Sequence, residues 1–315
     1  MIVSTTDELL YQHVKRIVEH TGETPLVYAA IEDIPASVAE QTTCLITFGN
    51  DLTADNIRAF PKLQWIQMCS AGLEDLPFSA LHERGILVTS ATGIHVVPMS
   101  EYVVLCMLHF EKDMERYRSL KEQKVFDRTK LVGELIHREV LIYGTGVIGQ
   151  AVANLLKVFR MEVYGVNTSG RPVEPFRETY KLGEETERLE SADYVISILP
   201  STSQTRGLFS ADYLERMKRD AVLISIGRGD VIDENHVVDM LKNGRLKGAA
   251  FDVFQKEPLP VDSPLWECEN LILTPHMSAK SIHYIDRCVD IFLHNWQALR
   301  DQTPLKNVVD TLREY

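Results

Sequence analysis

Arg228, Glu257 and His276 are the residues of this sequence whose types suggest chemistry, and each follows a short apolar run typical of a strand. An arginine carries a fixed charge on a planar fork that matches a carboxylate. A histidine donates a proton near neutral pH, and a carboxylate beside it orients the ring and favours its charged form. The three residues together predict a site that binds an acidic substrate and transfers a proton.

Each of the three also has a plain structural explanation when taken singly. Arg228 and Glu257 could form a buried ion pair, and His276 could be a satisfied core histidine. All three, however, follow strands of what we expect to be one parallel sheet, and ligands bind beyond the carboxyl ends of such strands. That shared position favours catalysis. Gly227 and Gly229 flank the arginine, and we expect them to leave room for a ligand.

Residues 140–153 predict a strand, a turn and a helix that could bind a cofactor for these three residues. The turn has the pattern Gly-x-Gly-x-x-Gly, in which Gly144 permits a tight turn, Gly146 lets the backbone approach a pyrophosphate and Gly149 lets the helix pack on the strand. The phosphates would face the free N–H groups at the positive end of the helix. A second strand at residues 162–166 has the spacing of a dinucleotide-binding unit, so we prefer that interpretation to a glycine-rich turn that only packs.

Beside a nicotinamide cofactor, the three side chains suggest one reaction. Arg228 would hold a 2-oxo acid by its carboxylate and polarise its carbonyl. Hydride from the cofactor would reach the carbonyl carbon, and the protonated His276 would give its proton to the oxygen as that oxygen becomes an alkoxide. The prediction is an oxidoreductase that uses a nicotinamide dinucleotide.

Strand and helix signals alternate along both halves of the chain, which predicts parallel sheets covered on both faces. In the first half, a capping box from Thr5 to Glu8 predicts a helix that ends near Gly22. We expect strands after it at residues 26–29, 44–48, 63–69 and 86–89, with helical stretches between them at 34–40, 53–59 and 78–84.

Pro98 suits the first turn of a long helix that we expect to reach residue 123, apolar at first and charged later. Six strands follow, at residues 140–143, 162–166, 194–199, 222–226, 248–253 and 271–273, and a last helix at 282–300 is expected to return to the first sheet. The predicted fold class is α/β, with two doubly wound parallel-sheet domains and a cleft between them. A flavodoxin-like substrate domain would comprise residues 1–97 and 284–315, and a Rossmann cofactor domain residues 98–283.

Two loops of the first half stand at expected carboxyl ends of strands, at residues 47–50 and 70–73. The second has small residues, Ser70, Ala71 and Gly72, whose backbone N–H groups could face a carboxylate. An ordinary turn would look the same. His95 precedes the long helix and is more easily explained as structural than as catalytic.

The composition excludes several kinds of partner. The chain has 315 residues and a formal net charge of −12, with no basic cluster, so nucleic acid and anionic membrane surfaces are not expected partners. No apolar run reaches membrane-spanning length, and the acidic start does not resemble a signal peptide. The five cysteines are scattered without a Cys-x-x-Cys pair, which predicts free thiols in a reducing cytoplasm.

The chain resembles the D-isomer-specific 2-hydroxyacid dehydrogenase family over most of its length. The resemblance rests on the glycine turn and on the motifs at residues 199–205, 227–234, 252–260 and 275–276. It implies that Arg228, Glu257 and His276 are catalytic, that Asp252 accepts a hydrogen bond from the nicotinamide amide, and that no metal is used. It also implies a homodimer formed through about residues 99–137. The substrate-binding residues would be Ser70, Ala71, Gly72, Arg228 and His276. The cofactor-binding residues would be Gly144, Thr145, Gly146, Val147, Ile148, Gly149, Asn167, Thr168, Ser169, Arg171, Leu199, Pro200, Thr205, Ile226, Gly227 and Asp252.

The sequence departs from the family pattern at Asn167, where members that prefer NAD usually carry aspartate. An asparagine does not repel a 2′-phosphate and can donate to one. Thr168 and Ser169 add hydroxyls, and Arg171 adds a positive charge. We therefore expect NADP(H) to be preferred, with NAD(H) still possible.

Several functions remain open within this resemblance. The first is a reductase of a short 2-oxo acid such as glyoxylate or hydroxypyruvate. The second is an NAD-dependent dehydrogenase working in the oxidative direction, similar to phosphoglycerate dehydrogenase, which the lack of an added C-terminal domain argues against. A third is a cofactor-sensing binding protein similar to the C-terminal binding protein corepressors, which would not need the complete Arg–Glu–His set. Formate dehydrogenases typically carry glutamine at the position of Glu257, so that branch is disfavoured.

Overall fold

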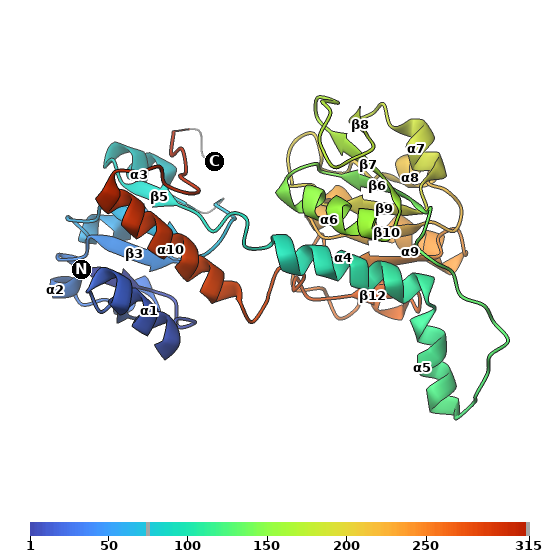
Figure 1. Cartoon of the computed structure of the whole chain (residues 1–315), viewed down its shortest axis with the longest axis horizontal. Coiled ribbons are helices and arrows are strands. Elements are labelled where there is room, and N and C mark those ends of the chain that lie inside the picture. Colours follow the sequence, from blue (N-terminus) through green and yellow to red (C-terminus); the bar gives the residue numbers. More distant parts are fainter. Residues whose placement is uncertain (74–75, 313–315) are drawn as a thin grey trace. The chain divides into compact units, whose positions relative to one another are not determined.

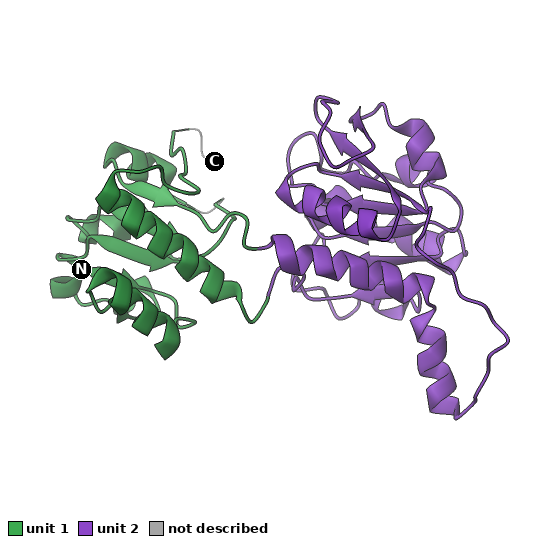
Figure 2. Ribbon diagram, viewed as in Figure 1, with its two compact units in different colours: residues 1–94, 281–315 green, residues 95–280 purple. Residues whose placement is uncertain are grey.

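The computed structural model describes residues 1–73 and 76–312. The chain divides into two compact units, drawn in different colours in Figure 2. Unit 1 is Met1–Ile94 with Ser281–Tyr315, and unit 2 is His95–Lys280. The boundaries expected from the sequence, after residues 97 and 283, lie close to these divisions.

Unit 1 is built on a sheet of five parallel strands in the order β2-β1-β3-β4-β5. This is the flavodoxin order that the sequence predicts. The first strand was not predicted, because only three residues form it and they precede the supposed capping box. The strands are β1 (Ile2–Ser4), β2 (Leu26–Val27), β3 (Cys44–Thr47), β4 (Trp65–Met68) and β5 (Leu87–Thr89).

Helices cover both faces of this sheet: α1 (Tyr11–Thr21), α2 (Ala36–Ala39), α3 (Phe78–Glu83) and α10 (Tyr284–Asp301), with 3₁₀ turns η1 (Ile31–Asp33) and η2 (Asn56–Ala59). The predicted capping box at Thr5 is wrong, because α1 begins only at Tyr11. Its first turn is closed instead by His13, whose Nδ1 accepts a hydrogen bond from the Leu10 amide at 3.0 Å. Gly22 ends the helix with a φ of 74°, as predicted.

The last helix of the chain, α10, belongs to unit 1 and lies beside α1 (Figure 1). Its Phe292 is stacked on Trp65 of β4, with ring centroids 5.1 Å apart. Both side chains are buried, and such aromatic pairs add to the stability that burial alone provides. This helix therefore closes one face of the sheet that carries the Ser70–Gly72 loop.

Unit 2 contains a sheet of seven parallel strands in the order β12-β11-β10-β9-β6-β7-β8. Six of them were predicted, in the Rossmann arrangement. The seventh, β8, is a polar edge strand with no buried residue, so it lacks the apolar pattern of a strand. The strands are β6 (Glu139–Tyr143), β7 (Glu162–Asn167), β8 (Glu178–Lys181), β9 (Tyr194–Ser197), β10 (Val222–Ser225), β11 (Gly248–Phe251) and β12 (Leu271–Leu273).

The helices of unit 2 include α6 (Val147–Val158), which follows the glycine turn and packs against α4 (Val96–Glu111). The remaining helical segments are α5 (Met114–Gln123), α7 (Thr186–Ser191), α8 (Ala211–Leu214), α9 (Glu234–Lys242), η3 (Gly229–Val231) and η4 (Pro264–Glu267). Two apolar clusters fill the two faces of the sheet. No described helix of the protein is both long enough and apolar enough to cross a bilayer.

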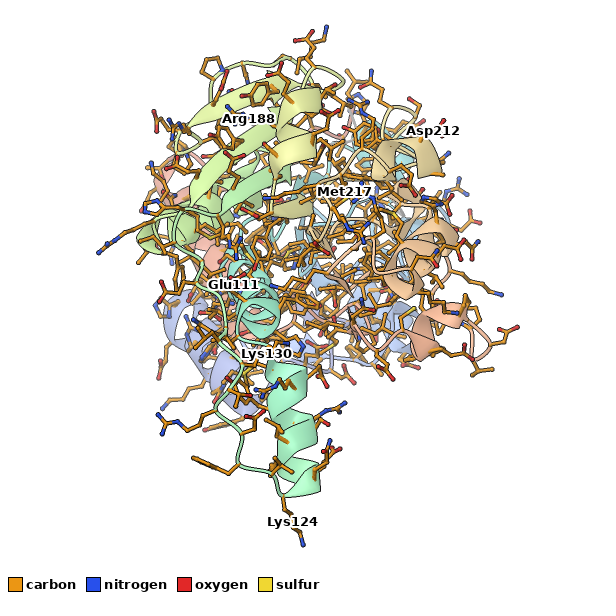
Figure 3. All side chains as sticks on the ribbon, turned by 90° about the vertical axis from the view of Figure 1, so that its right-hand side faces the viewer. Glu111, Lys124, Lys130, Arg188, Asp212 and Met217 are labelled. Carbon is orange, nitrogen blue, oxygen red and sulfur yellow. The ribbon has the colours of Figure 1, made fainter. Side chains whose placement is uncertain are left out.

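The long helix predicted to reach residue 123 is wrong as a single element. It breaks after Lys112, and Asp113 has a φ of 53°. The apolar part, α4, is packed into unit 2, whereas α5 has no buried residue and extends away from the body of that unit, with Lys124 beyond its end (Figures 1 and 3). The change from apolar to charged residues therefore marks a real change of surroundings.

A buried carboxylate stands at the end of α4. Glu111 is 3% exposed, and it accepts hydrogen bonds from the Tyr194 hydroxyl at 2.6 Å and from Arg138 at 2.9 Å. Lys247 lies 3.6 Å away. Burial raises the pKa of Glu111, but these donors and positive charges outweigh burial and lower it below its usual value.

Candidate active site

Arg228, Glu257 and His276 follow three neighbouring parallel strands of unit 2, β10, β11 and β12. The His276 Nδ1 lies 2.8 Å from Oε2 of Glu257. The other oxygen of Glu257 accepts a hydrogen bond from the Phe254 amide at 3.0 Å. The carboxylate is thus held at both oxygens and orients the imidazole through Nδ1. Among the described residues, Nε2 of His276 has no hydrogen-bond partner, so this nitrogen is the one that could donate to a substrate.

The charges around Glu257 keep it ionised. Its burial raises its pKa, but the hydrogen bonds from His276 and from the Phe254 amide, with the positive charges of His276 and Arg228, lower the pKa below its usual value. The ionised Glu257 therefore orients the His276 ring through a charge-assisted hydrogen bond to Nδ1.

Arg228 is exposed and stands between two buried glycines. A Cβ on Gly227 would lie 2.3 Å from the Leu199 carbonyl oxygen, and one on Gly229 would lie 1.9 Å from the Phe254 carbonyl carbon. Whether these glycines also leave room for a ligand stays a prediction. They are needed because the backbones of two neighbouring loops pack directly against the arginine turn, one of them the loop that carries Glu257.

The glycine turn at the start of α6 has three differently placed glycines. Gly144 has a φ of 108°, which favours glycine. A Cβ on Gly149 would lie 2.0 Å from the Gly144 carbonyl oxygen, so this residue allows the helix to pack on the turn. A Cβ on Gly146 would meet nothing within 4 Å. The backbone at Gly146 is thus open, as a cradle for a pyrophosphate at the helix N-terminus would be.

Asn167, at the end of β7, is occupied within its own loop. Its Oδ1 accepts hydrogen bonds from the amides of Ser169 and Gly170, at 3.1 and 2.7 Å. Its Nδ2 donates to the Arg171 carbonyl oxygen at 3.0 Å and to Thr145 Oγ1 at 3.3 Å. Asn167 therefore shapes the loop rather than presenting a free donor. The Arg171 side chain is exposed and forms no ion pair with any residue in the described part of the chain.

Comparisons with known proteins show which family the chain belongs to. Residues 104–278 match the model of the D-isomer specific 2-hydroxyacid dehydrogenase NAD binding domain. A D-isomer specific 2-hydroxyacid dehydrogenase family protein from Aeromonas salmonicida has a solved structure that superposes with a TM-score of 0.84, at 33% identity, covering 98% of both chains. The chain belongs to this family.

Other members of the family have more specific descriptions. A glyoxylate reductase of Korarchaeum cryptofilum is 30% identical over 79% of this chain and 76% of its own length. A probable 2-hydroxyacid dehydrogenase of Rhizobium etli, solved with NADP, is 26% identical, with a TM-score of 0.77 and coverage of 100% of this chain and 98% of its own. A D-3-phosphoglycerate dehydrogenase of Methanocaldococcus jannaschii is 27% identical over 89% of this chain, which spans only 54% of that protein.

Within this NAD(P)-binding family, the loop at residues 199–205 of our chain is tied to the arginine turn. Thr205 donates its hydroxyl to the Pro200 carbonyl oxygen at 2.5 Å. Ser201 donates to Asp230, two residues beyond Arg228, at 2.5 Å. Ile226 is buried below the turn. These contacts hold the predicted cofactor residues Leu199, Pro200, Thr205 and Ile226 on one framework.

Asp252 was predicted from the resemblance to bind the nicotinamide amide, yet its carboxylate already has internal partners. It is fully buried and accepts hydrogen bonds from the Thr274 hydroxyl at 2.6 Å and from the amides of Met277 and Ser278, at 2.8 and 2.9 Å. Sequence reasoning missed Thr274 as a site residue. Its position directly after β12, two residues before the histidine, was the available signal.

The Ser70–Gly72 loop lies in unit 1, beside a hollow of about 290 Å³ that Phe48 and Leu73 also line. The Ser70 hydroxyl lies 2.8 Å from the Gly72 carbonyl oxygen and 3.1 Å from that of Phe48, and its one proton can donate to either. The hydroxyl therefore holds the loop in shape, which leaves the backbone amides as its candidate anion donors.

Reactive cysteines and metal ligands are the other kinds of site that the side chains could form. All five cysteines are free and buried. A hydrogen bond to Cys288 and burial raise the pKa of Cys69, so this thiol is a poor nucleophile. No three His, Cys, Asp or Glu side chains of the described residues gather as metal ligands do.

Proposed function

We propose that this chain reduces a short 2-oxo acid to the D-2-hydroxy acid. The observation that supports this most strongly is the 2.8 Å contact between His276 and an ionised Glu257, beside Arg228 at the ends of adjacent strands. A histidine that only packed in the core would not be expected to leave its Nε2 without a hydrogen-bond partner among the described residues. Family membership supports the same reaction class.

In this proposal Arg228 binds the substrate carboxylate and polarises the adjacent carbonyl. A bound nicotinamide dinucleotide supplies the hydride that reduces the carbonyl carbon. His276 gives its Nε2 proton to the oxygen, which becomes the hydroxyl of the product. Glu257 stabilises the imidazolium before transfer and orients the ring through Nδ1. In the oxidative direction, the same nitrogen accepts the proton.

For the cofactor we propose the turn from Gly144 to Gly149, with the open backbone at Gly146 against the pyrophosphate. NADP(H) is the proposed preference, and NAD(H) remains possible. Thr168, Ser169 and Arg171 would bind the 2′-phosphate, while Asn167 holds their loop in place. The solved Rhizobium etli relative, which holds NADP, supports this choice.

We also propose that the Ser70–Gly72 loop binds carboxylate through its backbone amides. Ser70→Ala should then raise the KM for the oxo acid, because the loop loses the hydroxyl that holds it in shape. The KM for NADPH should stay unchanged, because the hydroxyl supports only this loop. An unchanged KM for the oxo acid would remove the loop from the substrate site.

A homodimer is the proposed assembly, formed through about residues 99–137. The support is the exposure of large apolar side chains along this segment, with Leu105 64%, Phe126 91% and Leu131 90% exposed. Such a surface is unusual for a monomer. Light scattering after size exclusion should give twice the 35.8 kDa chain mass. The free thiols support placement in a reducing cytoplasm.

The test of the reaction follows loss of NADPH absorbance with a panel of 2-oxo acids that includes glyoxylate and hydroxypyruvate. The wild type is compared with His276→Gln, a variant that nearly keeps the side-chain size and removes the titrating group. Turnover by the wild type with about a thousandfold or greater loss in the variant supports the proposal. NADPH binding without turnover of any acid would favour the alternative of a cofactor-sensing protein. Faster oxidation of a D-2-hydroxy acid with NAD would favour the oxidative alternative.

A further inference from the structure

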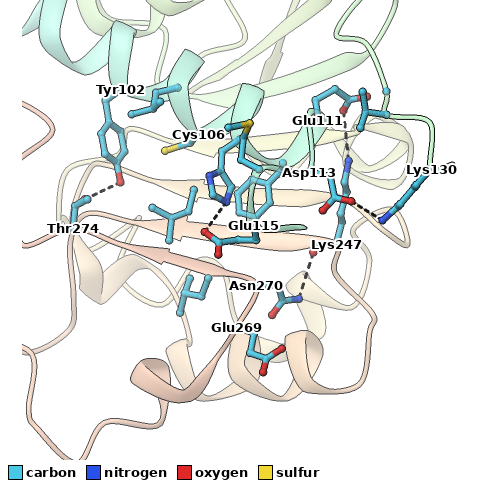
Figure 4. Close-up of a pocket in the computed structure, with 18 of the residues that line it drawn as sticks. Tyr102, Cys106, Glu111, Asp113, Glu115, Lys130, Lys247, Glu269, Asn270 and Thr274 are labelled. Carbon is cyan, nitrogen blue, oxygen red and sulfur yellow. Dashed lines mark hydrogen bonds and ion pairs between the residues drawn. The ribbon is translucent and has the colours of Figure 1, made fainter. Parts of the chain in front are cut away.

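A chain of hydrogen bonds links helix α4 to the loop that carries His276. The Tyr102 hydroxyl lies 2.7 Å from the Thr274 hydroxyl, a contact that Figure 4 marks with a dashed line. The Thr274 hydroxyl donates to Asp252 at 2.6 Å. A threonine hydroxyl has one proton, so Tyr102 must donate to Thr274. Burial raises the pKa of Tyr102, which keeps it a neutral donor.

Asp252 gathers the loop around its buried carboxylate. The amides of Met277 and Ser278 donate to its two oxygens, and the His276 amide donates to its backbone carbonyl at 2.9 Å. Hydrogen bonds to a charged group are the stronger kind, and the Asp252 carboxylate accepts three, from Thr274, Met277 and Ser278. The residues on both sides of the histidine are thereby tied to one fixed point.

His276 itself needs such support. Its φ is 53°, in the left-handed region that non-glycine residues adopt only at a cost in free energy. This backbone conformation aims the imidazole at Glu257, 2.8 Å away. A loop released from Asp252 would relax toward negative φ, and the imidazole would leave the carboxylate.

We propose that Tyr102 and Thr274 are positioning residues for the proton donor His276, acting through the Asp252 carboxylate. The inference rests on the proposed reduction, and it gives helix α4 a part in the chemistry. Asp252 then serves mainly as the anchor of the histidine loop. Tyr102 and Thr274 are 172 residues apart in the sequence, and both also line a hollow of about 690 Å³ beside α4, α5 and β12 (Figure 4).

The experiment compares four variants of the full chain. Tyr102→Phe removes only the first donor, and Thr274→Val removes the hydroxyl in the middle of the chain at constant shape. Thr274→Ser keeps that hydroxyl and serves as the conservative rescue. Tyr180→Phe is the control, because it removes a tyrosine hydroxyl that bonds to Glu178 at the far edge of the same sheet. Thermal unfolding identifies any variant that fails to fold.

The expected kinetic result is a fall in kcat with nearly constant KM values. Loss of one neutral hydrogen bond predicts about a fivefold lower kcat for Tyr102→Phe, and loss of a bond to a carboxylate predicts about thirtyfold for Thr274→Val. KM for NADPH and for the oxo acid should stay within about twofold, since neither hydroxyl touches the ligands in this account. Thr274→Ser should recover most of the wild-type kcat, and Tyr180→Phe should equal the wild type.

Three outcomes would overturn the inference. Unchanged kcat in Thr274→Val is the first. A weakened NADPH affinity with unchanged kcat is the second, because it would make the network part of the cofactor site only. The third uses hydrogen exchange of the Met277 and Ser278 amides, which should speed up in both Tyr102→Phe and Thr274→Val. Unchanged exchange overturns the inference even if the wild type reduces no acid, in which case the proposed function fails separately.

Discussion

Gly146 offers a test of the cofactor site that does not depend on turnover. An alanine there adds one methyl group to a backbone whose φ and ψ, −72° and −170°, suit any residue. Apart from its neighbours in the chain, no atom of the described residues lies within 4 Å of that methyl group. Gly146→Ala should therefore fold normally, with a free energy of unfolding within about 0.5 kcal/mol of the wild type, the usual difference between glycine and alanine at a helix N-cap.

The dinucleotide should bind much more weakly to this variant. If the pyrophosphate lies against Gly146, the methyl group displaces it from the free N–H groups at the start of α6. Loss of one or two charge-assisted hydrogen bonds amounts to about 3 kcal/mol, which is roughly a hundredfold rise in Kd for NADPH. Isothermal titration measures this Kd directly, and thermal unfolding measures the stability.

Gly149→Ala is the matched control, since its methyl group would lie 2.0 Å from the backbone oxygen of Gly144. Overpacking of this kind costs about 1–3 kcal/mol, so the melting temperature of a unit of this size should fall by about 2–12 °C. The two variants thus separate binding from packing within one turn. An unchanged NADPH affinity in a stable Gly146→Ala protein would refute the assignment of the pyrophosphate to this turn.

Three further variants test the site and the core. Glu257→Gln should shift the fall in reductive rate to lower pH, because the neutral amide no longer favours a protonated His276; an unchanged pH profile would remove Glu257 from that role. Arg171→Ala should lower kcat/KM with NADPH about tenfold or more and leave kcat/KM with NADH unchanged, whereas equal effects would make Arg171 a plain surface residue. Glu111→Gln should lower the stability of unit 2 by about 3 kcal/mol at neutral pH. The pKa of Glu111 is lowered in the folded state, so its stabilisation is present above the ordinary glutamate pKa and is lost as the pH falls through the folded-state pKa. Thermal unfolding of the wild type and the variant between pH 7 and pH 3 should therefore show the difference in their stabilities shrinking.

Most strand positions in both sheets could be predicted because buried parallel strands read as apolar runs. Two strands were not predicted, for opposite reasons. The first, Ile2–Ser4, is apolar but only three residues long, and Glu178–Lys181 is a polar edge strand without a buried residue. The break after Lys112 was also missed, because a charged stretch continues with good helix formers and nothing in the local sequence requires Asp113 to adopt positive φ.

The three side chains proposed as catalytic were accessible to sequence reasoning because each stands a few residues after a strong strand. Their supports were not. Tyr102 lies on a helix among apolar residues, where its hydroxyl has no local signal, and its partner Thr274 is 172 residues away. Which donors converge on the Asp252 carboxylate depends on how neighbouring strand ends are staggered, and that is a property of the assembled sheet.

The glycines show most clearly what the sequence leaves undecided. Gly146 and Gly227 both stand in loops at the carboxyl ends of strands, and both were expected to leave space for a ligand. A methyl group on Gly146 would meet nothing within 4 Å, whereas one on Gly227 would lie 2.3 Å from the Leu199 carbonyl oxygen. The first position is open to a ligand, and the second is filled by the protein itself. A glycine that admits a ligand and a glycine that admits a neighbouring loop are identical in sequence, so the distinction rests on the atoms around each one. That is why Gly146→Ala tests cofactor binding, while a substitution at Gly227 would test only the packing beneath Arg228.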